Sequence, residues 1–165
     1  MKLRSSGAGV LFGTFLAALT LSVAAPGSAY AAACAGSGCD GHDPNIQTWQ
    51  SGPVTTYYED LGNSTYIELR WGKTDGDQYS WGRIGYVGLV PSSPSYRITV
   101  ERCNSAGTSC TTNLGSTAAG ASAWTAKIDT NSYVTRTPMY YNPSTSKMRA
   151  CAIPSSGSKV CTPYY

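Results

Sequence analysis

The chain has 165 residues, carries a formal net charge of +3 and contains only 13% charged residues. A typical domain has about 25% charged residues, so uncharged polar side chains must supply most of this surface. Because the basic residues form no cluster, nucleic acid and anionic membranes are disfavoured as partners.

The N-terminus is predicted to be a signal peptide, residues 1–31. Lys2 and Arg4 form a positive region, residues 10–25 are apolar, and residues 29–31 read Ala-Tyr-Ala, a small-x-small cleavage site. The apolar stretch is shorter than the roughly 20 residues of a membrane-spanning helix, which disfavours a permanent anchor. The remaining residues, 32–165, are predicted to form one secreted, extracellular β domain that has no membrane contact after cleavage.

Six cysteines predict a disulfide framework, because an even number in an exported chain is typical of paired thiols. Each cysteine has a close partner in the sequence, and the last two pairs flank segments that read as hairpin loops. Among the fifteen possible connectivities, local pairing is favoured: Cys34–Cys39, Cys103–Cys110 and Cys151–Cys161. A lipid-modified Cys34 is the alternative, and it would leave Cys39 without a partner.

Short runs of alternating apolar and polar residues predict an all-β fold, either a disulfide-stapled β-sandwich or a jelly-roll-like single domain. In the first run, Ile67, Leu69 and Trp71 share one face of a strand, and Glu68 and Arg70 share the other. In chain order, the predicted strands cover residues 66–71, 79–90, 96–101, 123–129, 134–141, 148–153 and 160–164.

The strand predicted at 96–101 has a similar alternation. Ile98 and Val100 are expected to point inward and Glu101 outward. Residues 114–122 are rich in Ala, Gly, Ser and Thr, and this composition predicts a loop.

Two acidic motifs are candidates for chemistry. Residues 40–43, Asp-Gly-His-Asp, place the single histidine between two carboxylates, which suits a metal or an acid–base pair, but Asp before Gly and before Pro favours a turn. Asp-Gly-Asp at 75–77 suits calcium, yet the motif is more typical of a hairpin turn.

Glu59, Asp60 and Glu68 offer a possible carboxylate pair, but acidic residues that are neighbours on a strand more often lie in solvent. The chain has no Gly-x-Ser-x-Gly motif, so we expect no enzyme activity, no cofactor and no metal.

The aromatic residues are the stronger functional signal. The phases of Trp71, Trp81 and Trp124 predict core positions. Adjacent tyrosines behave differently, because neighbours on a strand point to opposite faces and one of each pair should be exposed or at an interface. The candidate binding residues are therefore Tyr57, Tyr58, Tyr140, Tyr141, Tyr164 and Tyr165.

Three segments carry a family resemblance. Residues 34–44 (CAGSGCDGHDP), residues 67–84 with Leu-Arg-Trp and a later Trp-x-Arg, and residues 137–165 with Arg-Ala-Cys and Cys-Thr resemble the YjfA-like family of secreted bacterial domains. Members of that family commonly have one more cysteine soon after the Asp-Pro and another between the Leu-Arg strand and the tryptophan of the Trp-x-Arg motif. Here Trp49 stands near the first position and residues 73–79 contain no cysteine.

The resemblance implies an extracellular β domain without established catalysis, and some similar proteins act as bridging subunits of umbrella-type toxin particles. The leading expectation is a secreted, non-catalytic adaptor that binds another secreted protein, as a small subunit of an extracellular antibacterial toxin complex. The alternative is a carbohydrate or cell-wall binding module. An extracellular hydrolase or a hydrolase inhibitor is the weaker alternative.

Overall fold

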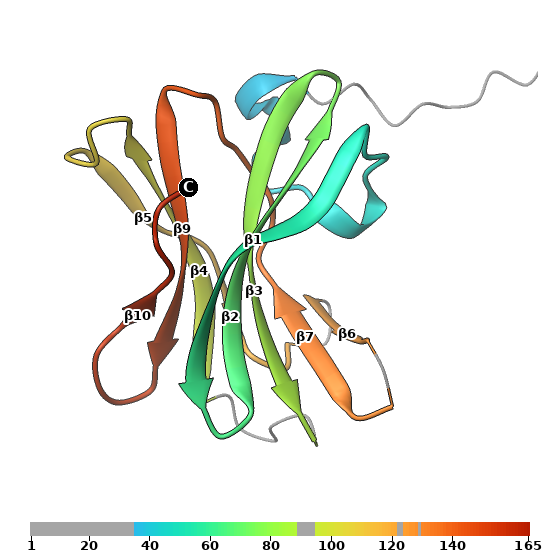
Figure 1. Ribbon diagram of the computed structural model, residues 1–165, viewed down its shortest axis with the longest axis vertical. Helices are drawn as coiled ribbons and strands as arrows, with labels where there is room; N and C mark the ends of the chain where they lie inside the picture. Colours follow the sequence, from blue (N-terminus) through green and yellow to red (C-terminus); the bar gives the residue numbers. More distant parts are fainter. Residues whose placement is uncertain (1–34, 89–94, 122–123, 129) are drawn as a thin grey trace, which may run out of the picture.

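Two antiparallel sheets pack face to face in the computed structural model, which describes residues 35–88, 95–121, 124–128 and 130–165 (Figure 1). The first sheet, sheet A, has the order β1-β2-β3-β7-β6, and β8 pairs with β3. Its strands are β1 (Ser51–Gly62), β2 (Thr65–Thr74), β3 (Asp77–Val87), β6 (Thr125–Lys127), β7 (Ser132–Arg136) and β8 (Tyr140–Tyr141). The second, sheet B, has the order β10-β9-β4-β5 and consists of β4 (Tyr96–Asn104), β5 (Cys110–Ala118), β9 (Ser146–Pro154) and β10 (Val160–Cys161). The predicted all-β sandwich is confirmed.

The main core lies between the two sheets. Ile67, Leu69 and Ile84 from sheet A have no exposed surface, and Ile98 and Val100 from sheet B are equally buried. The alternation in the sequence predicted the inward positions of Ile67, Leu69, Ile98 and Val100. Full burial of each such side chain stabilises the fold by about 1.5–3 kcal/mol, which makes this interface the principal source of stability.

Hairpin turns follow the predicted glycine chemistry. Asp75 and Gly76 connect β2 to β3 with φ angles of 51° and 85°, and Thr74 pairs directly with Asp77. A two-residue turn with both central residues at positive φ matches the right-handed twist of its strands and favours Asp-Gly. The prediction of a hairpin turn at residues 75–77 is confirmed.

Two disulfides connect directly paired positions in neighbouring strands of sheet B. Cys103 bonds to Cys110 across β4 and β5, and Cys151 bonds to Cys161 across β9 and β10. Two of the predicted local pairings are therefore confirmed. Cys39 is also in a disulfide, but its expected partner Cys34 lies outside the described residues, as does the predicted signal peptide, so that pairing stays a prediction.

The N-terminal segment forms a third layer on the outer face of sheet A. It contains two 3₁₀ turns, η1 (Gly36–Cys39) and η2 (Pro44–Ile46). A second hydrophobic cluster lies beneath it, formed by Cys39, Tyr79, Trp81 and Met139, with Trp49 and Tyr141 packed against it. Within the described residues, no helix is long and apolar enough to cross a membrane.

Three predictions about individual segments were wrong. Residues 114–118, expected in a loop, belong to β5, an edge strand that pairs through its backbone and needs few apolar side chains. The run 134–141 is divided between β7 and β8. Trp71 and Trp124 are half-buried rather than core residues, because Trp71 stacks on the C-terminal Tyr165 and Trp124 lies against the Arg136 guanidinium.

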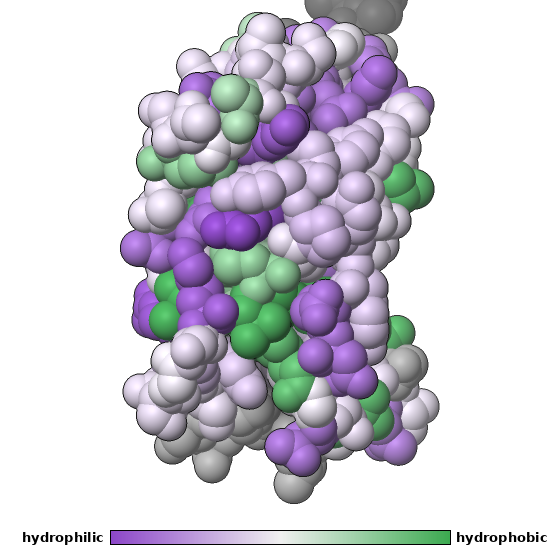
Figure 2. All heavy atoms as spheres, turned by 60° about the vertical axis from the view of Figure 1, so that its left-hand side comes forward, coloured by the Kyte–Doolittle hydropathy of each residue, from purple (hydrophilic) through white to green (hydrophobic). Residues whose placement is uncertain are grey.

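The molecular surface reflects the sparse charge of the sequence. Figure 2 shows one side of the molecule, largely pale, with scattered hydrophilic residues and a narrow hydrophobic band near its middle. Exposed large apolar side chains occur elsewhere too, among them Ile46, Tyr58 and Ile128. Specific binding must therefore depend on local groups of side chains.

Candidate functional site

A pair of stacked tyrosines marks the outer face of sheet A. The rings of Tyr58 on β1 and Tyr66 on β2 lie 5.1 Å apart, and Tyr58 is 55% exposed. The Tyr66 ring lies directly on Gly85 of β3, where a Cβ atom would come within 2.1 Å of the ring. The glycine thus lets the tyrosine lie flat on the sheet and present its stack to solvent.

A cavity of about 290 Å³ lies on the same face, between the N-terminal segment and strands β2, β3, β6 and β7. We call it the arginine–tryptophan pocket. Trp49 and Trp81, whose rings stack at 5.2 Å, form part of its lining. The other residues used below are Arg70, Arg83, Arg136, Ile128, Pro53, Asn45 and Gln47.

Two of the three arginines in this pocket are neutralised. Arg83 forms an ion pair with Glu68 across β2 and β3. Arg136 binds both carboxylate oxygens of Asp43, with its Nε 2.9 Å and its Nη2 2.8 Å away. These bonds from Arg136 hold the pKa of Asp43 below its ordinary value, more strongly than its partial burial raises it.

Arg70 is different from both neighbours. Its Nη2 donates to the carbonyl of Pro53 at 2.9 Å, and its buried Nε has no hydrogen-bond partner. No carboxylate among the described residues forms an ion pair with it. Burial lowers the pKa of Arg70, and repulsion by the Arg83 cation lowers it further. Attraction to the nearby Glu68 carboxylate offsets only part of this lowering of the pKa, so the pocket holds one positive charge that no ion pair among the described residues neutralises.

The two carboxylates of the acidic motif at residues 40–43 form hydrogen bonds and ion pairs with other parts of the fold. Asp43 accepts from the backbone N–H of Asn45 at 2.9 Å, as the predicted turn requires. Both carboxylates of the motif also form ion pairs with arginines that are distant in the sequence. Asp40 pairs with Arg102 at 2.9 Å, and Asp43 pairs with Arg136. The sequence did not predict these long-range ion pairs, which attach the N-terminal layer to β7 of sheet A through Arg136 and to β4 of sheet B through Arg102.

His42 participates in the same attachment through its backbone. Its carbonyl accepts from the N–H of Met139 at 2.9 Å, and Gly41 donates to the Met139 carbonyl at 2.9 Å. The His42 side chain is exposed. The motif is thus a strap with a structural role.

A second, larger hollow of about 540 Å³ lies at one end of the sandwich. Two candidate binding residues, Tyr141 and Tyr165, line it together with Gln78, Asn142 and Lys147. We call it the end pocket. Segments far apart in the sequence build it: the β2–β3 hairpin, the β8–β9 connection and the C-terminus.

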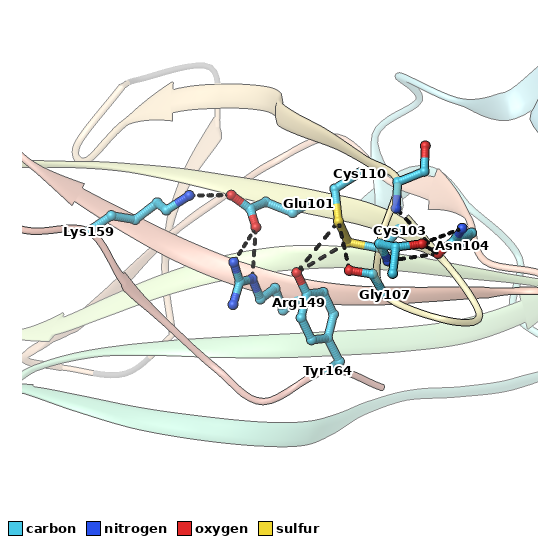
Figure 3. The surroundings of a disulfide bond; sticks show 10 residues. Glu101, Cys103, Asn104, Gly107, Cys110, Arg149, Lys159 and Tyr164 are labelled. Atoms are coloured by element: carbon cyan, nitrogen blue, oxygen red, sulfur yellow. Dashed lines mark hydrogen bonds and ion pairs between the residues drawn. A yellow bond between two sulfur atoms is a disulfide. The ribbon is translucent and has the colours of Figure 1, made fainter.

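Both C-terminal tyrosines are attached to sheet B, and Figure 3 shows the surroundings of Tyr164. Tyr164 lies under the Arg149 guanidinium, 4.5 Å from its ring centroid, and its hydroxyl is 3.2 Å from Sγ of Cys103. The backbone of Tyr165 pairs with Met148 in both directions, at 2.8 and 2.9 Å. Tyr164 is therefore an anchor, and Tyr165 is the member of this pair that remains exposed.

Glu101, expected to face solvent, has a buried side chain with 1% exposure. Arg149 donates to its Oε2 at 2.7 and 2.6 Å, and Lys159 contacts its Oε1 (Figure 3). Burial alone would raise the pKa of Glu101, but the hydrogen bonds from Lys159 and Arg149 outweigh it and the pKa is lowered. Glu101 also lies near Sγ of Cys151 and Cys161, but sulfurs joined in a disulfide do not offer thiolate ligands for a metal.

The three tyrosine pairs have different environments. In pair 57–58, Tyr58 is exposed and Tyr57 packs against the main core, as predicted. In pair 164–165 the second residue is exposed. In pair 140–141 neither is exposed, because the two rings pack against the two separate hydrophobic clusters. Whether any of these tyrosines binds a ligand stays a prediction.

Comparison of the chain with models of protein families gives no match, and comparison with curated proteins and with solved structures gives none either. The resemblance to the YjfA-like family therefore stays a prediction.

Proposed function

We propose that this protein is a secreted, non-catalytic adaptor that binds another secreted protein through the outer face of sheet A. One observation carries the proposal: exposed or half-exposed Tyr, Trp and Arg side chains gather there around an arginine that the fold leaves unpaired. These three residue types contribute most to binding energy at protein interfaces. The Tyr58–Tyr66 stack and the arginine–tryptophan pocket meet on strand β2, where Tyr66 and Arg70 have the same facing.

A non-catalytic role agrees with the ion pairs that the acidic motif at residues 40–43 forms. The carboxylates of Asp40 and Asp43, which flank the single histidine in the sequence, are taken up by arginines. Export agrees with the disulfides of sheet B, since such bonds are typical of proteins outside the cell. The resemblance to secreted bridging subunits supports the adaptor role specifically.

The test is recovery of tagged protein from culture supernatant, followed by identification of stably bound proteins. We expect a defined partner, and we expect Tyr58→Ala to reduce its recovery at least tenfold. Tyr165→Ala, at the end pocket, is the matched control and should retain the partner. Isolation of the protein without any partner, or loss with Tyr165→Ala but not with Tyr58→Ala, would contradict the proposal.

A carbohydrate or cell-wall ligand is the second candidate, favoured by the end pocket. The exposed Tyr165 offers an aromatic side chain there beside Tyr141, and Gln78 and Lys147 add polar groups, a combination suited to a ring-shaped polar ligand. This candidate predicts sedimentation with purified cell wall that Tyr165→Ala abolishes and Tyr58→Ala does not. Equal sedimentation of both variants would remove it.

A further inference from the structure

The unpaired Arg70 gives the arginine–tryptophan pocket a definite chemical preference. Three guanidinium groups and two carboxylates lie in or at the pocket, and ion pairs use two of those guanidinium groups. We propose that the pocket is a receptor for one carboxylate of the partner protein, an Asp or Glu side chain next to an apolar residue. The inference rests on the proposed adaptor function and specifies what the adaptor recognises.

The donors of Arg70 are arranged for an incoming anion. A guanidinium has five N–H groups. One Nη2 proton goes to the Pro53 carbonyl and the Nε proton is buried, so the other Nη2 proton and both Nη1 protons remain for a ligand. A carboxylate can accept two of these in parallel, which is the strongest form of arginine recognition.

The walls of the pocket select what carries the carboxylate. Ile128 is 48% exposed, and Trp49 and Pro53 add further apolar surface on one side, while Asn45 and Gln47 contribute amides to the lining. A ligand with hydroxyl groups on every side, such as an acidic sugar, would lose hydrogen bonds to water against the apolar part of these walls. An acidic side chain beside an aliphatic or aromatic one matches both the charge and the apolar lining.

The size of the cavity points the same way. Its volume of about 290 Å³ lies just below the range of small-molecule pockets, roughly 300–1,000 Å³. It accommodates one or two side chains while the rest of a partner lies against the flat Tyr58–Tyr66 stack. The pocket and the stack together thus resemble an anchored interface more than an isolated ligand site.

The experiment uses the mature exported protein and two short probes, acetyl-Phe-Glu-amide and acetyl-Phe-Gln-amide. NMR of arginine Nε–H groups follows Arg70 directly during the titration. We expect the Glu probe to shift the Arg70 signal saturably and to bind at least tenfold more tightly than the Gln probe. The preference should weaken as the salt concentration rises.

Substitution shows whether Arg70 causes that preference. Arg70→Gln should abolish it, and Arg70→Lys should keep only part of it because an ammonium group lacks the planar fork. Arg97→Gln is the matched control, since Arg97 is exposed on sheet B and bonds Ser116. Because Arg70 is an unpaired, partly buried cation, Arg70→Gln is expected to fold and to be at least as stable as the wild type.

Three results would overturn the inference: equal binding of the two probes, a preference unchanged in Arg70→Gln, or binding of glucuronate in place of the Glu probe.

The adaptor proposal and the receptor inference can be refuted independently of each other. If a partner is recovered equally with Arg70→Gln and with wild type, but is lost with Tyr58→Ala, the adaptor stands and the receptor is wrong. If the Glu probe binds at Arg70 but no partner is recovered, the receptor stands and the adaptor is wrong.

Discussion

Replacement of Glu101 by Gln tests how sheet B holds the C-terminus. The substitution keeps the shape of the side chain and removes its charge. The glutamine oxygen can still accept from one cation, but its amide N–H₂ then faces the other. One charge-assisted hydrogen bond, contributing about 1.5–3 kcal/mol, is lost and the second becomes weaker, so we expect destabilisation of about 2 to 4 kcal/mol at pH 7.

The exposure of the two partners keeps this cost moderate. The Arg149 and Lys159 side chains are 29% and 37% exposed, so water can solvate both cations after the carboxylate has gone. Net stabilities of domains are about 5–15 kcal/mol, and a loss of this size is readily measured by urea unfolding of the oxidised protein. Glu59→Gln on β1 is the matched control, because Glu59 forms no ion pair within the described residues. We expect it to change stability by less than about 0.5 kcal/mol.

The pH dependence separates charge from shape. The pKa of Glu101 in the folded protein lies below its ordinary value of 4.5, so its ionised form is favoured by folding. Its contribution is therefore complete above about pH 4.5 and disappears as the pH falls through the lowered pKa. The difference in the free energy of unfolding between wild type and Glu101→Gln should therefore decrease as the pH falls below about 4.5. A loss under 1 kcal/mol at pH 7, or an equal loss at pH 7 and in strong acid, would refute the assignment of Glu101 as a buried anion.

Three further changes address other parts of the fold. Replacing Cys151 and Cys161 together by Ala opens a loop with a sequence separation of 10, which by chain entropy should lower the free energy of unfolding by about 2.7 kcal/mol in urea titrations. Gly85→Ala places a Cβ against the Tyr66 ring; we expect a cost of about 1–3 kcal/mol and weaker partner recovery, and unchanged recovery would show that the tyrosine stack is not the contact surface. Asp43→Asn should destabilise the fold by about 1–2 kcal/mol at pH 7 and increase hydrogen exchange in the N-terminal layer. The wild-type advantage over Asp43→Asn should fade below about pH 3.8, since the lowered pKa of Asp43 makes its ion pair fully effective only above its ordinary value.

Local pattern explains which parts of the fold could be predicted. Alternation in β2 and β4 identified Ile67, Leu69, Ile98 and Val100 as inward-facing, because in a sandwich the period of two decides which face is buried. The same rule correctly placed Glu101 on the opposite face of β4. The expectation that its side chain would be exposed to solvent was wrong, because it is buried. Alternation says which way a side chain points, but the groups that cover it come from distant segments.

The arginine–tryptophan pocket depends on the order of strands in sheet A, which could not be predicted from the sequence. Strand β3 pairs with β7 rather than with β4, and this order places Arg83 directly beside Arg136. The outward facing of Arg70 was predicted from its strand. The sequence could not predict that Arg70 has no carboxylate partner. That depends on the tertiary structure, in which Glu68 pairs with Arg83 and Asp43 pairs with Arg136.

The two cysteine positions that the YjfA-like resemblance implies meet in space in this chain. The backbone N–H of Gln50, next to Trp49, donates to the Lys73 carbonyl at 2.8 Å, and the Gln50 side chain accepts from Gly76 at 2.9 Å. The Trp49 ring rests on Gly72, where a Cβ would come within 2.5 Å of it. Aromatic stacking and hydrogen bonds thus connect the two segments in which the predicted resemblance would place one further cysteine each. Because Trp49 also lines the arginine–tryptophan pocket, a tryptophan at this position both attaches the N-terminal layer and gives the proposed receptor its apolar wall, which a cysteine pair would not provide.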